Sequence, residues 1–154
     1  MEGNMKKHMV YFTYIALLIL PIQAQVTEKI QAMHDECRLV RGHAYMIQQM
    51  IDEGNYNETV ARAHFTIIDT NLKALIFTLR EIETLLTSQQ KMRVGSEMER
   101  LFEICNDTKP LIDSMREHLD EDNPNLGRIR VLAVRINRNL RDAMNIQTTL
   151  LKKI

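Results

Sequence analysis

The sequence predicts an all-α protein that folds as an antiparallel four-helix bundle with an up-down-up-down order. Two observations predict this fold: four stretches repeat apolar residues at alternating spacings of four and three, and short breaks separate them. The spacing is the 3.5-residue period of helices packed nearly parallel or antiparallel. Because connections of about five residues leave no room for a long crossover, consecutive helices are expected to run in opposite directions.

The four apolar stripes span residues 26–51, 61–86, 94–119 and 129–154. Their side chains are expected to form one heptad-like, coiled-coil-like core. Thr108 and Gln147 are the polar members of these stripes, and seven methionines follow residue 25. Since methionine is flexible and fills irregular gaps, the core is expected to be deformable.

Turn-forming residues mark the three breaks at 53–57, 93–96 and 122–125. In the second break, Gly95 is expected to end one helix, and Ser96 to begin the next within the capping-box pattern S-x-x-E. In the third break, Asn123 is the candidate N-cap, which places Pro124 at the first helical position.

Pro110 interrupts the third stripe without changing its phase. A proline inside a helix removes a backbone hydrogen bond and bends the helix. The sequence therefore predicts either a third helix kinked near Pro110 or two helices joined end to end, with Thr108 capping the second.

The first 24 residues have the organisation of a secretory signal peptide. Lys6 and Lys7 precede the apolar run 10–20, and Ala24 offers a small residue for cleavage before Gln25. The alternative is an uncleaved membrane anchor, but an 11-residue run is too short to cross about 30 Å of hydrocarbon. We therefore expect a secreted, extracellular protein without a membrane span, in which residues 25–154 form a single domain.

Cys37 and Cys105 are expected to form an intrachain disulfide. Both lie on core stripes, at similar heights in two helices that run parallel. The bond requires a flattened bundle, because the first and third helices of a square bundle are diagonal and a disulfide needs Cα atoms within about 7 Å. An intermolecular bridge and two free thiols are the alternatives.

Two N-glycosylation sequons begin at Asn57 and Asn106. Each has the pattern N-x-T, which is short enough to arise by chance. Behind a signal peptide, however, the two together favour a eukaryotic secretory route and an N-glycoprotein.

Composition and motifs exclude several classes of function. The chain carries 20 basic and 20 acidic residues, and this balance argues against a dedicated nucleic-acid binder. The histidines do not form an H-E-x-x-H pattern, and no serine stands in a G-x-S-x-G setting. His118, Glu121 and Asp122 are interpreted as a solvated helix end. We therefore expect no metal, no cofactor and no enzymatic activity.

Charge is distributed unevenly along the second half of the chain. Residues 97–122 carry nine acids against three bases, a net charge of −6, and residues 125–154 carry seven bases against one acid, a net charge of +6. Opposite charges on adjacent helices usually satisfy each other first. Alternatively, the basic helix offers a surface to an acidic partner. The candidate partner-binding residues are Arg128, Arg135, Arg138 and Arg141.

Together these features predict a secreted, non-enzymatic binding protein: an extracellular ligand, modulator or inhibitor that binds a protein partner through a helix face. The alternative is a carrier that holds a small apolar ligand inside the bundle, with Thr108 or Gln147 meeting the polar head of the ligand. The repeat pattern is compatible with a monomer or a dimer.

Overall fold

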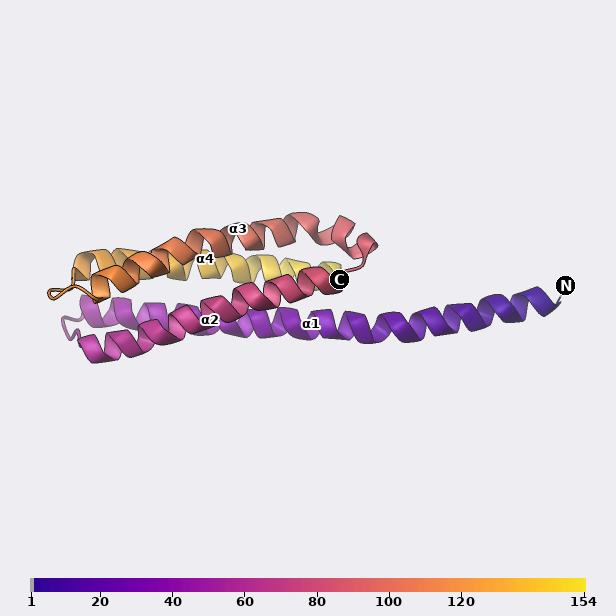
Figure 1. The fold of residues 1–154 in the computed structure, drawn as a ribbon, viewed down its shortest axis with the longest axis horizontal. Coiled ribbons are helices and arrows are strands. Elements are labelled where there is room, and N and C mark those ends of the chain that lie inside the picture. The colour runs from indigo at the N-terminus through magenta and orange to yellow at the C-terminus, as the bar shows by residue number, and fades with distance from the viewer. Residues whose placement is uncertain (1) are drawn as a thin grey trace.

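The computed structural model describes the backbone of residues 2–154 and the side chains from residue 22 onward. The described chain is all-helical and folds as the predicted bundle (Figure 1). Each helix runs antiparallel to the next, and the bounds of the four are α1 Glu2–Asp52, α2 Glu58–Leu85, α3 Ser88–Leu119 and α4 Leu126–Lys153.

The first part of α1 extends past the ends of the other three helices (Figure 1). This part includes residues 2–24 of the predicted signal peptide, 1–24, most of whose side chains lie outside the described residues. Cleavage before Gln25 stays a prediction. From residue 22 onward, no described helix contains an apolar stretch long enough to cross a membrane.

The helices form a closed square in which α1 packs against α2 and α4, and α3 completes the square between them. In the described part of the chain, no Cα atom of α1 lies within 8 Å of a Cα atom of α3. These two helices are therefore diagonal, as they are in an unflattened bundle.

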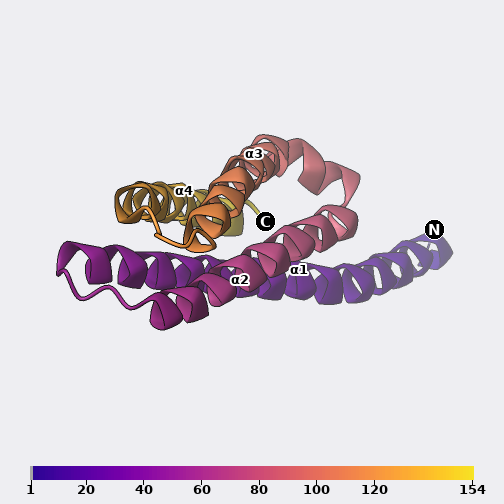
Figure 2. The same ribbon diagram turned by 60° about the vertical axis from the view of Figure 1, so that its left-hand side comes forward.

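The contact between α2 and α3 is the loosest of the four sides, and α3 diverges from α2 in Figure 2. The side chain of Arg116 on α3 spans this side. Its guanidinium lies 3.0 Å from the carboxylate of Asp69 and 5.4 Å from the ring centre of Phe65. The guanidinium thus adds an ion pair and a cation–π contact where apolar packing is weakest.

The predicted stripes are the core. Every stripe position is buried except Ile51 and Ile154, which are half-buried at the ends of their stripes. Thr108 and Gln147 are fully buried with the apolar members. Since burial of one large apolar side chain contributes about 1.5–3 kcal/mol, the stripes account for most of the driving force of folding.

The boundary between α2 and α3 lies about two turns earlier in the chain than predicted. Thr87 is the N-cap of α3: its hydroxyl accepts a hydrogen bond from the amide of Gln90, and the side chain of Gln90 accepts one from the amide of Thr87, at 3.0 Å. Ser96 lies inside α3 and donates to Glu97 instead of capping a helix. A Cβ atom on Gly95 would meet nothing within 4 Å, so packing does not require a glycine at this position of the helix.

The predicted N-cap of α4 is also wrong, by two residues. Asn125, and not Asn123, accepts a hydrogen bond from the amide of Arg128, at 3.1 Å. The first break is where it was predicted, since Asn57 caps α2 and Gly54 adopts a φ of 69° in the turn. Glycine enters that left-handed conformation without a steric penalty.

One continuous helix, α3, runs through Pro110. The alternative of two helices joined end to end is therefore wrong. Thr108 caps no helix: its hydroxyl donates to the carbonyl of Ile104 one turn earlier, at 2.6 Å. Such back-bonding is common for threonine inside a helix and is often accompanied by bending.

The capping box at Thr87 leads to a stability prediction. Thr87→Ala should lower the free energy of unfolding by about 1 kcal/mol, because it leaves amide groups at the start of α3 without partners. Ser96→Ala is the matched control and should cause no loss, since alanine is the better helix former. Urea denaturation, followed by circular dichroism, measures the free energy of unfolding of both variants. A larger loss in Ser96→Ala than in Thr87→Ala would indicate that the helix begins at Ser96.

Candidate functional site

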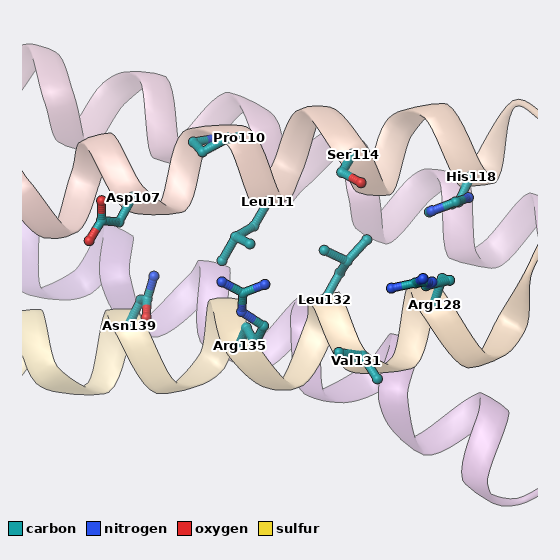
Figure 3. A pocket seen from close by; sticks show the side chains of 10 residues that line it. All are labelled: Asp107, Pro110, Leu111, Ser114, His118, Arg128, Val131, Leu132, Arg135 and Asn139. Atoms are coloured by element: carbon teal, nitrogen blue, oxygen red, sulfur yellow. The ribbon is translucent and has the colours of Figure 1, made fainter.

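The candidate site is a groove of about 600 Å³ between α3 and α4. It is larger than a groove of about 480 Å³ between α1 and α2 and one of about 320 Å³ near the α2–α3 connection. Figure 3 shows that side chains from both helices project into the space between them. The residues that line it are Asp107, Pro110, Leu111, Ser114, His118, Arg128, Val131, Leu132, Arg135 and Asn139.

The floor of the groove is apolar because it borders the core stripes. Leu111 follows Pro110 on α3, Leu132 lies beside the stripe on α4, and both leucines are buried. Val131 extends the apolar surface and is exposed. The floor therefore offers apolar contact to a bound molecule without opening the core.

The basic side of the groove comes from α4. Arg128 and Arg135 are exposed, and Figure 3 shows both guanidinium groups in the space between α3 and α4. Within the described residues, neither guanidinium forms an ion pair with a carboxylate. Both charges are thus available to a ligand.

Partner binding by the four predicted arginines stays a prediction, but the groove separates them into two pairs. Arg128 and Arg135 line the groove, whereas Arg138 and Arg141 do not. Arg141 lies 3.9 Å from the carboxylate of Asp142, its neighbour in the sequence. For a ligand in this groove, the candidate residues are therefore Arg128 and Arg135.

The charges of α3 and α4 neutralise each other directly at a single described contact. Lys153 at the end of α4 lies 2.6 Å from Glu97 near the start of α3. The other described ion pair of α4 with another helix joins Arg130 to Asp52 of α1. The sequence favoured the interpretation that the charges of these two helices neutralise each other. Among the described residues, this holds at one end of the α3–α4 interface only.

A polar contact closes the end of the groove that lies beside Asp107. The amide of Asn139 on α4 donates to the hydroxyl of Thr108 on α3, at 3.1 Å. This hydrogen bond satisfies a threonine that is fully buried and links the two helices. Sequence alone placed Thr108 on the core stripe but did not supply its partner.

The predicted disulfide is wrong, since Cys37 and Cys105 are both free and buried. They lie on α1 and α3, whose described Cα atoms are all more than 8 Å apart, and a disulfide needs Cα atoms within about 7 Å. Burial raises the pKa of both thiols to about 12. Because the thiolate is the reactive form, both cysteines are expected to be inert in the folded protein.

Gln147 fills the space beside Cys37. Its amide nitrogen donates to the sulfur of Cys37, at 3.2 Å, and this bond opposes the effect of burial on the pKa of the thiol. The amide oxygen of Gln147 is buried and has no hydrogen-bond partner among the described residues. Gln147 and Thr108 therefore bond to different partners and do not form one polar site.

Sequence reasoning missed a pair of histidines between α1 and α2. His43 and His64 are 21 residues apart, and their Nδ1 atoms lie 2.7 Å from each other. A pattern such as H-E-x-x-H places two histidines on one helix and cannot reveal this pair, which depends on the axial alignment of two helices. Burial, and then the charge of His43, lower the pKa of His64.

Both sequon asparagines are exposed. Asn57 caps α2 through its side-chain oxygen, at 3.0 Å from the amide of Val60. Asn106 lies within α3, and its sequon threonine, Thr108, is fully buried. Glycosylation at the two positions stays a prediction.

Comparisons of the chain with models of protein families, with curated proteins and with solved structures found no match.

The free cysteines lead to a chemical prediction. In the native protein, both thiols should resist a thiol reagent at neutral pH, and two thiols should titrate once the chain is denatured without a reductant. Mass spectrometry of the denatured, unreduced chain checks the same point. A mass lower by two hydrogens would show instead that the two cysteines form the intrachain disulfide.

The histidine pair leads to a pH prediction. The folded state holds the pKa of His64 below its ordinary value of 6.5, so the unfolded chain binds this proton more tightly. The stability that neutral His64 contributes is present above pH 6.5 and is lost as the pH falls below it.

The test compares urea midpoints at pH 7.5 and 5.5 for the wild type and His64→Gln. The variant should lose less stability on acidification than the wild type does. Burial raises the pKa of Glu36, which acts in the opposite direction, and the comparison with the variant cancels this contribution. Equal losses in the two proteins would contradict the prediction.

Proposed function

We propose that the protein is a secreted, non-enzymatic binding protein that holds an acidic segment of an extracellular protein partner in the α3–α4 groove. One observation carries the proposal: Arg128 and Arg135 reach into the groove, and within the described chain neither is paired with a carboxylate. Charges that the fold does not neutralise are available for recognition.

The spacing of the two arginines suits a peptide. Seven residues on one helix place their Cα atoms about 10.5 Å apart along its axis. On a segment in the polyproline II conformation, with three residues per turn and a rise of about 3.1 Å per residue, carboxylates three residues apart lie on one face and about 9 Å apart, which is close to this spacing. Each guanidinium can then donate two hydrogen bonds to one carboxylate.

The rest of the groove adds selectivity for a mixed segment. The apolar floor at Leu111 and Leu132 accommodates an apolar side chain between the two carboxylates. Asp107 at the far end disfavours a ligand that is negative throughout its length. A protein segment fits this pattern better than a uniformly sulfated polysaccharide does.

Secretion, glycosylation and a non-enzymatic role are parts of the same proposal. The signal-like segment 1–24 and the sequons at Asn57 and Asn106 support secretion and glycosylation. A binding role is supported by the lack of any catalytic motif in the sequence.

A second candidate function is carriage of a small apolar ligand inside the bundle. It is supported by the buried amide oxygen of Gln147, which has no partner in the described core and could accept a hydrogen bond from a ligand. Native mass spectrometry of the secreted protein tests it. Release of a small molecule on denaturation would establish the carrier, whereas equal native and denatured masses would exclude a tightly bound ligand.

Charge removal in the groove tests the main proposal. The probe is a fluorescent peptide with two glutamates three residues apart around a leucine, and its binding is followed by anisotropy. Arg128→Ala with Arg135→Ala should weaken binding about tenfold or more, because it removes charge-assisted hydrogen bonds.

The matched control is Arg138→Ala with Arg141→Ala, which removes the same charge from α4 outside the groove. It should leave affinity within about twofold, since exposed charges act weakly at physiological salt. Equal weakening by the two pairs would indicate unspecific attraction to α4. Stronger binding of heparin than of the peptide would redirect the proposal to a glycosaminoglycan.

A further inference from the structure

We propose that His43 and His64 form a two-histidine site for a divalent transition-metal ion that prefers imidazole ligands, of which Zn²⁺ is the probe. The site would link α1 to α2. It lies between a different pair of helices from the α3–α4 groove and does not rest on the function proposed for that groove.

The geometry of the two rings carries the proposal. The Nδ1 atoms of His43 and His64 face each other at 2.7 Å, and the ring centroids are 4.9 Å apart with the planes inclined at 41°. Two imidazole lone pairs cannot face each other at this distance without repulsion. In the metal-free protein, one nitrogen must therefore carry a hydrogen that it donates to the other.

A metal ion can take the place of that hydrogen, because the proton can move through water to Nε2 of the same ring, which leaves both Nδ1 lone pairs free to bind the ion. Zinc binds imidazole nitrogen at about 2.0–2.1 Å in a tetrahedral arrangement, so two ligand nitrogens lie about 3.3 Å apart. The pair must therefore open by roughly 0.6 Å, a movement of the size that small side-chain rotations provide. Both rings are only half-buried, so this movement does not disturb the core.

The ion would keep open coordination positions. Within the described residues, no group of three or more histidine, cysteine, aspartate or glutamate side chains is placed to hold a metal. Water or a donor from another molecule must complete the coordination. The position permits it, because exposed Leu39 and Met46 flank His43 one turn away on α1, and exposed Val60 flanks His64 on α2.

The other described histidines do not provide an equivalent pair. His118 bonds to the carboxylate of Glu121 on its own helix, at 2.7 Å. The Nδ1 atom of His34 is buried and has no described partner. Substitution at these two positions removes two imidazoles without touching the proposed site, and thus supplies a matched control.

The experiment is a Zn²⁺ titration of the full chain by isothermal calorimetry, together with thermal unfolding with and without the metal. At saturating Zn²⁺ the Tm of the wild type should rise by about 5 °C, because the ion binds the folded chain and links two helices. The rise should reverse on addition of EDTA. It should disappear at pH 5.5, where protons compete for both imidazoles.

His43→Gln with His64→Gln should abolish both the binding heat and the rise in Tm. Glutamine keeps a hydrogen-bonding side chain at each position, and the single variant His43→Gln replaces the double variant if the latter does not fold. His34→Gln with His118→Gln should behave as the wild type does. A wild type without a Zn²⁺-dependent shift, or a His43 variant that retains the full shift, would overturn the proposal.

Discussion

The four helices pack as a closed square because each has one apolar stripe to bury, and in a square all four stripes face a common interior. This arrangement determines which helices are neighbours and which are diagonal. It makes α1 and α3 diagonal, which separates Cys37 from Cys105, although both lie on core stripes. It also places α4 between α1 and α3, so that the two flanks of α4 meet different neighbours: Arg130 pairs with α1, whereas Arg135 enters the groove beside α3.

The stripes could be predicted residue by residue because burial on a helix follows from periodicity alone. The helix ends could not, because several capping signals compete within a few residues. Gly95 and Ser96 form a conventional break, yet Thr87 and Gln90 supply the reciprocal hydrogen bonds that begin α3. Glycine inside a helix costs about 1 kcal/mol, a penalty that the extra turns of α3 offset by burying Val94. Local motifs show where a helix can begin, and tertiary packing selects among them.

The candidate sites depend on distances between helices, which the periodicity of a sequence does not give. The sequence showed that α4 is basic, but which of its arginines line the groove depends on how α4 is rotated about its axis relative to α1 and α3. With Ile136 and Leu140 buried, Arg135 lines the groove and Arg138 does not. The pairing of His43 with His64 depends in addition on the axial alignment of α1 and α2. Height along a helix can be counted from sequence, whereas rotation and lateral separation come only from packing.

The electrostatics of α3 and α4 connect the fold to its proposed role. Net charges of −6 and +6 on consecutive segments favour their association at long range, before any ion pair forms. In the folded state, however, Lys153 and Glu97 form the one ion pair between α3 and α4 among the described residues. Exposed ion pairs contribute about 0–1 kcal/mol each, so the fold loses little by leaving the arginines unpaired. A ligand carboxylate over the apolar floor is partly shielded from water, and there the same charges interact more strongly than they do across open solvent. Groups that contribute little to stability can in this way contribute much to recognition.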